Sequence, residues 1–542
     1  MIRFLIGLLL SLPGASWACG GLFCDSTMPV NQAAERILFA VEGETLHMHV
    51  RITYQGPPAA FGWLLPVPRD VETKLSSEQL FTQLDASFAP VFRLTTEFEE
   101  GCEPDFAASG APTAESDSRD GGGGVNVLSR ENVGPYDRAI LLPDSIDLLR
   151  EWLDENGYQI PDATDAKLAP YLEVGAAFVA IKLLPGTDSS DIVPLHLSFN
   201  SATPTIPIIP TSVAAEPDMG IIVQILGPSR AIPSNYLHVQ INETAIDWFG
   251  QGSNYADVVS QAADEAGGQA FTTDFAGPHE GRVNLPPVSD MTLSQLEAAE
   301  TASRAANYLF PDLFDGFGPQ PDADLQRVFL AHVDMPEELS LFDLVENGRV
   351  ANAEAIDGVT WMKDELLQSL AEEINEPRLH LAALFEANPY LSRLYGTMSP
   401  DEMTVDPMFT FNADLETVDN NRRATRYVSC VFGSPDFDNA VIETPSGLRF
   451  RPGARGDDGL ITRQAGETVR GVDVTGAMVI EQHLGAGQPE LVEDRRAVII
   501  ADNLVNAGGG GGCSCDVSAA EPVGIGTLIF GLALLGFRRR IR

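Results

Sequence analysis

The chain has 542 residues and is strongly acidic, with 77 Asp and Glu against 34 Lys and Arg and a formal net charge of −43. A surface of this charge repels nucleic acid and anionic lipid, so we exclude both as partners of the body of the protein. The hydrophobic content of 44% is ordinary for a globular chain, and the length allows about two to four domains.

Residues 1–18 predict a secretory signal peptide. Arg3 supplies the positive start, residues 4–12 form the apolar segment, and Ser16 and Ala18 provide the small residues of a cleavage site before Cys19. A lipoprotein signal would also place Cys19 at the new N-terminus, but it requires a branched apolar residue where Ser16 stands. We therefore expect export with cleavage after Ala18, and lipidation of Cys19 is the alternative.

Cysteines in the exported part predict disulfides, because an oxidising compartment preserves them. The four cysteines Cys19, Cys24, Cys102 and Cys430 allow three pairings. We favour Cys19–Cys24, whose members are near in sequence, and Cys102–Cys430, which would join distant segments. A metal site at Cys19 and Cys24 is the alternative for the first pair.

The first half of the body predicts strands. Residues 45–54 alternate apolar and polar side chains and pair with residues 37–41 as a hairpin. Further strands are expected at 61–68, 176–184, 193–199, 221–226 and 236–241, with an amphipathic helix at 145–156. Residues 103–124 are acidic and rich in Gly, Ala and Ser, and predict a disordered loop. Residues 19–245 are thus expected to form a β-rich domain, closer to a sandwich than to a parallel sheet.

Several stretches of this body are similar to one bacterial family. They are CGGLFC at 19–24, PVNQAAERI at 29–37, FGWLLPVP at 61–68, VGPYDRAIL at 133–141, EWLDENGY at 151–158, VGAAFVAIKL at 174–183 and NPYLSRLYGTMSPDEMTVDP at 388–407. With these motifs the chain resembles domain-of-unknown-function family 2330 over most of residues 19–406. The resemblance implies no known activity, so it assigns no functional residue.

The remainder of the body predicts a mainly helical segment at 246–406 and a β-rich segment at 407–505. Helices are expected at 254–266, 293–309, 339–346, 360–374 and 378–386, with another starting at Ser399. Strands are expected at 427–432, 448–451, 467–481 and 497–501. The predicted fold class is therefore α+β, with mostly antiparallel, sandwich-like β domains and a helical middle.

The end of the chain predicts a membrane anchor. Residues 506–522 form a tether with five consecutive glycines followed by Cys513 and Cys515. The uncharged segment 523–537 predicts a transmembrane helix, and residues 538–542 contain four arginines. Arginine beside an apolar helix stays on the cytoplasmic side because carrying it through the bilayer is costly, which places the body outside the cytoplasm. A buried C-terminal helix is the alternative.

This tail resembles the MYXO-CTERM protein-sorting signal, in which a short Cys motif, an apolar helix and a basic end follow one another. The Cys motif here is GCSC at 512–515. The resemblance implies surface sorting, removal of the tail by a membrane-embedded protease, and lipidation of Cys513 or Cys515. At ~1.5 Å per residue the apolar helix is about 22 Å long, short of a ~30 Å hydrocarbon core, which favours transient retention before processing.

Few residue patterns point to chemistry. The chain has no GxxxxGK phosphate loop, no GxSxG nucleophile motif and no HExxH zinc motif. His47 and His49 share one strand face and could bind Zn²⁺ or Cu²⁺ if a third ligand approached, but we interpret them as polar residues on an exposed face. Asp401 and Glu402, with Asp406, are weak candidates for a carboxylate site, because capping of a helix accounts for them. We therefore assign no catalytic residue, no metal and no cofactor.

These observations favour a non-catalytic structural or binding module of the cell envelope, anchored in the membrane or at the surface. The expected partners are the membrane, through residues 523–537, and a sorting protease. An exported hydrolase with a dispersed active site is the alternative, and a deep pocket with convergent His, Asp, Glu or Ser side chains would favour it.

Overall fold

The computed structural model describes residues 32–52, 61–100, 127–158, 161, 163–184, 192–310, 322–337, 339–345, 356, 358–452, 468–469, 472–473 and 475–503. The expected signal peptide (1–18), the disordered loop (103–124), and the tether, apolar helix and basic end (506–542) lie outside these residues. Cys19, Cys24, Cys102, Cys513 and Cys515 also lie outside them.

A ten-stranded mixed sheet forms the centre of the described part, in the order β24-β23-β12-β13-β16-β10-β1-β2-β9-β4. Its strands are β24 (Glu490–Asp494), β23 (Ala477–Gln482), β12 (Leu237–Ile241), β13 (Ala270–Pro278), β16 (Tyr390–Met398), β10 (Ala215–Gly227), β1 (Gln32–Glu42), β2 (Thr45–Ile52), β9 (Leu195–Asn200) and β4 (Glu72–Leu75). The pairs β1–β10 and β12–β13 are parallel, and the other pairs are antiparallel. The sheet takes strands from all three predicted segments, 19–245, 246–406 and 407–505.

A second, four-stranded sheet packs on one face of the large sheet. It contains β3 (Gly62–Val67), β8 (Ala177–Leu183), β7 (Tyr136–Leu141) and β6 (Val127–Val133) in that order. Alternating side chains of β2, such as Met48 and Val50, join Trp63 and Val179 of the second sheet in one apolar core. The hairpin predicted from residues 37–54 is confirmed by the β1–β2 ladder.

Helices cover the outer faces of both sheets. The short helices α2 (Ile146–Glu155) and α3 (Thr164–Glu173) bury Trp152 and Leu168 against β7 and β8. On the free face of the large sheet, α1 (Glu78–Phe88) and α11 (Glu376–Ala387) pack Phe81 and Leu384 against β1 and β10. Ser145 caps α2, as its sequence pattern predicts.

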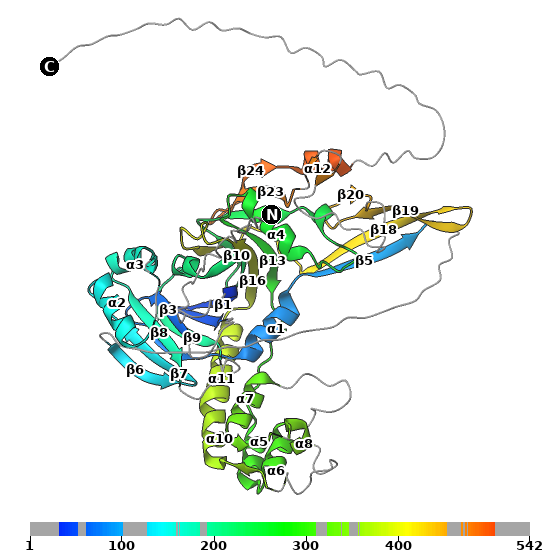
Figure 1. Ribbon diagram of the computed structural model, residues 1–542. Coiled ribbons are helices and arrows are strands. Elements are labelled where there is room, and N and C mark those ends of the chain that lie inside the picture. The colour runs from blue at the N-terminus through cyan, green and yellow to red at the C-terminus, as the bar shows by residue number, and fades with distance from the viewer. Residues whose placement is uncertain are drawn as a thin grey trace, which may run out of the picture.

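A helical lobe extends from the sheet at α11, as Figure 1 shows below the strands. It contains α5 (Asp290–Ala298), α6 (Ala302–Leu309), α7 (Ala323–Ala331), α8 (Leu341–Val345) and α10 (Lys363–Ser369), with the short pair β14 (Val333–Asp334) and β15 (Thr360–Trp361). A π-helical turn, Leu370–Asn375, joins α10 to α11. The lobe has its own apolar core, which includes Leu296, Phe329 and Leu366.

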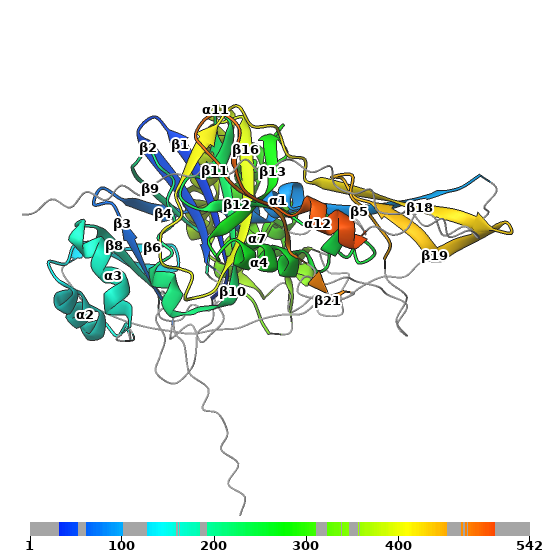
Figure 2. The ribbon, with the colours of Figure 1, turned by 90° about the horizontal axis from the view of Figure 1, so that it is seen from above.

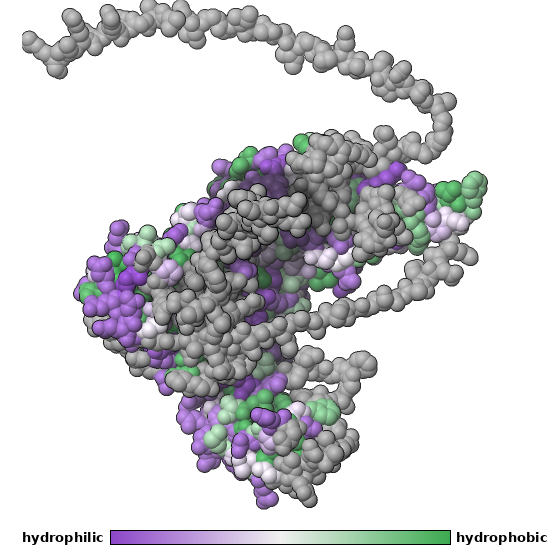
Figure 3. All heavy atoms as spheres, in the orientation of Figure 1, coloured by the Kyte–Doolittle hydropathy of each residue, from purple (hydrophilic) through white to green (hydrophobic). Residues whose placement is uncertain are grey.

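A long arm projects from the side of the molecule opposite the second sheet and lies on the right in Figure 2. Its strands are β5 (Val91–Phe98), β18 (Asn421–Val431), β19 (Ser434–Glu443) and β20 (Arg449–Phe450). Apolar residues gather at the arm's tip in Figure 3, where Val431, Phe432 and Phe437 are exposed. Between the arm and the large sheet lie α4 (Tyr255–Glu265) and α12 (Arg496–Asn503). The short pair β11 (Arg230–Pro233) with β17 (Phe409–Asn412) packs on the large sheet itself, and β21 (Thr468–Val469) pairs with β22 (Val472–Asp473).

The mixture of helices and large sheets agrees with the predicted α+β class, but several expected elements differ. The single strand expected at 467–481 is the short pair β21–β22 followed by β23. The helix expected at 360–374 begins as strand β15 and continues as α10 and the π-helical turn. The strand expected at 497–501 is helix α12, with Ile499 buried on its inner side. The helix expected from Ser399 is a turn. The Ser399 backbone N–H donates to the Glu402 carboxylate at 2.7 Å, as it would at a helix N-terminus, but the chain then continues irregularly. The single helix expected at 293–309 is broken between α5 and α6, and Thr301 caps the second of the two.

Candidate functional site

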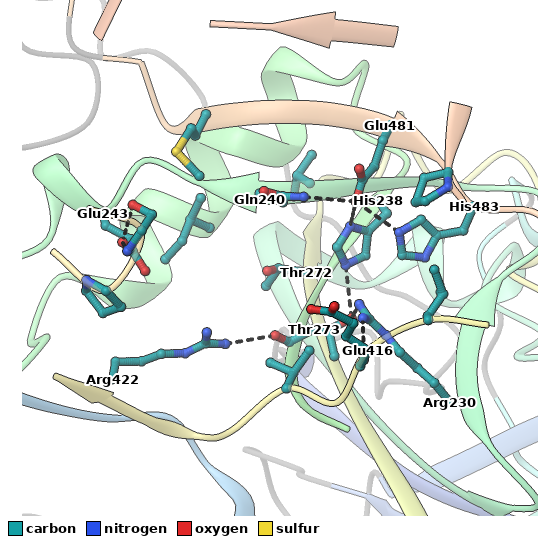
Figure 4. A pocket seen from close by; sticks show the side chains of 18 of the residues that line it. Arg230, His238, Gln240, Glu243, Thr272, Thr273, Glu416, Arg422, Glu481 and His483 are labelled. Carbon is teal, nitrogen blue, oxygen red and sulfur yellow. Dashed lines mark hydrogen bonds and ion pairs between the residues drawn. The ribbon is translucent and has the colours of Figure 1, made fainter. Parts of the chain in front are cut away.

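A cavity of about 490 Å³ lies where β12, β13 and β23 of the large sheet meet β11, α4 and the base of the arm. Figure 4 shows its polar side chains converging from both sides. Those that matter most for chemistry are Arg230, His238, Thr273, Arg422, Glu481 and His483.

Strand alternation directs the side chains of β12 to two environments. Val239 packs with Ala262 and Ala270 in a small apolar cluster, so the neighbouring side chains His238 and Gln240 face the cavity. Antiparallel pairing with β23 brings Glu481 directly opposite His238. His483 follows two residues later, just beyond the end of β23, and also lines the cavity.

A continuous hydrogen-bond chain crosses this wall of the cavity. Arg230 Nη2 donates to Thr273 Oγ1 at 3.2 Å, and that hydroxyl lies 2.9 Å from His238 Nε2. Because a guanidinium group only donates, the Thr273 hydroxyl accepts from Arg230 and can donate its own hydrogen bond to His238 Nε2. In neutral His238 the ring proton is then on Nδ1. Nδ1 then donates to Glu481 Oε1 at 3.0 Å.

Glu481 accepts from both histidines of the pair. His483 Nε2 lies 3.0 Å from the same Oε1 atom, and the two rings stack with centroids 4.1 Å apart. Burial raises the pKa of Glu481, but the hydrogen bonds from His238 and His483 outweigh burial and hold that pKa below its ordinary value. Burial, helped by His483, lowers the pKa of His238 to about 3. Near neutral pH Glu481 is therefore a carboxylate and His238 is neutral.

One histidine nitrogen in this cluster is unused. His483 Nδ1 is buried and has no hydrogen-bond partner among the described residues. With Nε2–H donated to Glu481, Nδ1 carries a lone pair on a ring whose orientation is fixed. Such a nitrogen can accept a hydrogen bond or a proton from a bound molecule.

Two arginines supply positive charge without a carboxylate in contact. Arg230 is 9% exposed and donates to the Glu416 carbonyl oxygen at 3.1 Å and to Thr273, while its Nε has no partner among the described residues. Arg422 donates to the carbonyl oxygens of Thr273 and Asp274 at 3.0 and 3.3 Å. Within the described part of the chain, neither forms an ion pair. The acids of the cavity are better satisfied, since Glu243 accepts two hydrogen bonds from Ser446.

His47 and His49, the residues singled out in the sequence, lie elsewhere. They sit on β2 under α11, where His47 is 6% and His49 1% exposed, so their interpretation as residues of an exposed face is wrong. The helix that covers them begins more than 300 residues later and left no local trace in the sequence. His196 of β9 and His380 of α11 join them.

The carboxylates considered together in the sequence are not one site. Asp406 accepts hydrogen bonds from the Tyr171 hydroxyl at 2.7 and 2.8 Å and from the Ile209 backbone N–H. Glu402 instead closes the turn at Ser399. Asp406 and Glu402 thus each have a structural partner, and Asp401 is exposed.

Cys430 lies at the end of β18, where its backbone N–H donates to the Glu99 carboxylate at 3.1 Å and its Sγ lies 3.8 Å from the Glu99 carbonyl oxygen. Cys102 follows Glu99 by three residues in the sequence. The ladder between β5 and β18 thus brings Cys430 toward the segment that leads to Cys102, and their disulfide stays a prediction.

The residues of the cavity were not identified from the sequence. Glu481 and His483 are two residues apart, as are His47 and His49, and this spacing is the one sequence pattern that could have indicated them as site residues. Arg230, Thr273 and Arg422 gave none, since each stands alone in its own stretch of chain.

Comparisons with known proteins identify one family. The model of the family described as "Uncharacterized protein conserved in bacteria (DUF2330)" matches residues 13–307, more than half of the chain. No curated protein and no solved structure matches the chain. Arg230, His238 and Thr273 lie inside the matched range, whereas Arg422, Glu481 and His483 lie beyond it. Among the described residues, none of the helices has the length and apolar character that crossing a membrane requires.

Proposed function

The chain belongs to this family of uncharacterised bacterial proteins, DUF2330, and we propose that it is an exported envelope protein that binds a small organic anion in the cavity of Arg230 and Arg422. The ligand class is a carboxylate or a phosphate ester small enough for a cavity of about 490 Å³. The protein acts as a binding module at the cell surface.

The observation that carries this proposal is the state of the charges in the cavity. Among the described residues, Arg230 is buried with an unused Nε and Arg422 donates to carbonyl oxygens, so neither guanidinium group is in contact with a carboxylate. Glu481 attracts Arg230 only from a longer distance. Burying an unpaired charge is costly, and an anionic ligand removes that cost. Guanidinium groups suit carboxylate and phosphate oxygens because their N–H donors form paired hydrogen bonds with them.

The test uses the mature protein purified from the envelope, titrated calorimetrically with a panel of small carboxylates and phosphate esters. We expect Arg422→Gln to weaken binding about tenfold or more, since a hydrogen bond to a charged group contributes about 1.5–3 kcal/mol and 1.4 kcal/mol is a factor of ten. Arg423→Gln is the matched control, because it removes the same charge from the next residue of β18, whose side chain is exposed. Equal losses in both variants, or no binding to any member of the panel, would contradict the proposal.

Export and surface anchoring belong to the same proposal and rest on the two ends of the sequence. Residues 1–18 supply the signal-peptide pattern, and residues 506–542 supply the tether, the cysteines, the apolar segment and the basic end. Mass spectrometry of the mature protein is expected to find Cys19 at the N-terminus and no peptide from 538–542. An intact chain that still ends in its arginines, recovered from the inner membrane, would mean simple anchoring without sorting.

A second candidate function, hydrolysis of the bound anion, is favoured by one observation. His483 Nδ1 is buried and has no partner in the part of the chain that the structure describes, and Glu481 orients the ring through Nε2. This is the arrangement of a general base held by a carboxylate. In the same titrations, release of product by the wild type and its loss in His483→Gln, with binding retained, would identify an enzyme. Binding without product release identifies the binding module.

A further inference from the structure

We propose that His47, His196 and His380 form a binding site for a divalent transition-metal ion such as Zn²⁺, separate from the anion cavity. The three side chains come from β2, β9 and α11. One ring nitrogen from each lies within 4.8 Å of the others.

The sheet register brings the first histidines together. His49 of β2 pairs directly with His196 of β9, and His47 lies two residues from His49 on the same face. The opposite face of β2 carries Leu46, Met48 and Val50 into the core between the two sheets, which fixes the register and therefore the side on which the histidines lie.

Helix α11 contributes the third histidine of the group, His380, on the face of the sheet that carries His47 and His196. Leu381 and Leu384 pack on β1 and β10, and this contact holds the preceding residue, His380, over the strand histidines. The His380 ring centroid lies 4.9 Å from that of His47 and 4.8 Å from that of His196. The site thus joins two strands and a helix from three distant parts of the chain.

The distances approach those of a metal centre. His47 Nδ1 lies 3.0 Å from His196 Nε2. Two nitrogens on a tetrahedral Zn²⁺ with Zn–N bonds of about 2.0–2.1 Å are separated by about 3.4 Å. Small rotations of the three rings bring their nitrogens to that spacing.

A purely structural cluster leaves too many nitrogens unused. A direct hydrogen bond between His47 and His196 uses one nitrogen of each ring, and Ser76 Oγ lies 2.8 Å from His49 Nδ1. The Nε2 atoms of His47, His49 and His380 nevertheless are buried without a hydrogen-bond partner in the described part of the chain. Buried polar atoms are normally paired, so unpaired nitrogens on three neighbouring rings indicate a missing partner, with Glu42 3.7 Å from one of them, His47 Nε2.

The charged groups around the cluster are few. Glu42 Oε2 lies 3.7 Å from His47 Nε2, which makes it the nearest carboxylate for a fourth position, and Lys74 forms an ion pair with Glu376 beside the cluster. A set of imidazoles selects Zn²⁺, Cu²⁺ or Ni²⁺ over Mg²⁺ and Ca²⁺, which prefer oxygen ligands. His49 stacks on His196 with centroids 4.4 Å apart and positions that ring.

The experiment uses the mature protein without a polyhistidine tag, stripped with a chelator, reloaded with Zn²⁺ in excess Mg²⁺ and measured by mass spectrometry of the metal content. Excess Mg²⁺ displaces Zn²⁺ from the acidic surface but not from imidazoles. We expect His47→Gln and His380→Gln each to bind one Zn²⁺ per chain fewer than the wild type. His238, Glu481 and His483 form a second group that could hold a metal, so His483→Gln is the control: it is expected to retain the ion that depends on His47 and His380.

Circular dichroism verifies that the variants are folded, and X-ray absorption of the loaded wild type gives a reading that needs no variant. Three imidazole ligands around the metal support the site. The proposal is overturned if the wild type holds no Zn²⁺ under these conditions, if both cluster variants retain it, or if the absorption spectrum shows only oxygen ligands.

Discussion

Glu35 on β1 is a buried acid whose environment disfavours its charge. It is 5% exposed, and its Oε2 has no hydrogen-bond partner among the described residues. Burial, followed by the nearby charge of Asp406, raises the pKa of Glu35 from 4.5 to about 7. Between these two values the unfolded chain has released the proton that the folded chain keeps, so the free energy of unfolding falls as the pH rises from about 4.5 to about 7.

Replacing Glu35 with Gln is expected to remove this loss of stability. The amide is neutral at every pH, so Glu35→Gln has about the same stability as the wild type at pH 4.5 and exceeds it by up to about 3 kcal/mol at pH 8. Urea unfolding at a series of pH values measures the difference. The exposed control Glu44→Gln is expected to show the same dependence of unfolding free energy on pH as the wild type. If Glu35→Gln also showed the wild-type dependence on pH, Glu35 would be ionised in the folded protein.

Secondary-structure elements were predictable from the sequence where a local pattern determines them. The hairpin β1–β2, strand β3 and helix α2 follow from alternation, from flanking prolines and from the N-cap Ser145. Helix α12 was mistaken for a strand because Val498, Ile499 and Ile500 are β-branched residues, which favour strands. In the structure, Ile499 packs into an apolar cluster from a helix. The parallel pairing of β1 with β10 joins residues almost two hundred positions apart, and no local pattern reports it.

The junction of the helical lobe with the sheet depends on Asp324 of α7. Its carboxylate accepts hydrogen bonds from the Ser77 hydroxyl at 2.6 Å and from the Glu78 backbone N–H at 2.9 Å, at the N-terminus of α1. It also lies 3.3 Å from Arg378 Nη2 of α11. A carboxylate from one helix therefore caps a second helix and balances the charge of a third.

Asp324→Ala is expected to destabilise the protein by about 3 kcal/mol, because it leaves buried donors unsatisfied and Arg378 with Asp322 alone. Denaturant unfolding followed by circular dichroism measures the loss. Asp290→Ala, which removes an exposed acid from the start of α5, is expected to cost less than about 1 kcal/mol. Similar losses in the two variants would mean that Asp324 acts only as a helix-end charge.

At the scale of the whole molecule, the candidate site exists only in the folded chain. Arg230, His238 and Thr273 lie within fifty residues of one another, but Arg422 and Glu481 enter through the arm and through the last strands of the sheet. The sequence predicted strands over His238 and Glu481, but not over Arg230, Thr273 or Arg422. It also could not show that β23 pairs with β12. The same holds for the histidine group under α11, of which the sequence revealed the β2 pair alone.

The acidic surface makes the arginine cavity an unusual feature of this protein. With a net charge of −43, most of the molecule repels anions, so an anion that binds must find local positive charge screened from the surrounding acids. The described cavity also contains Glu243 and Glu481, whose carboxylates are already held by hydrogen bonds from Ser446, His238 and His483. Arg230 and Arg422 are the groups there that can donate to an anion.

The most direct test of the anion site compares a ligand with its own uncharged counterpart. Calorimetric titration of the mature wild-type protein with each carboxylate of the panel is repeated with the corresponding amide, which has the same size and shape. The account predicts saturable binding of at least one carboxylate and at least tenfold weaker binding of its amide, as loss of a charge-assisted hydrogen bond requires. Equal binding of acid and amide would contradict the assignment of Arg230 and Arg422 as the anion site.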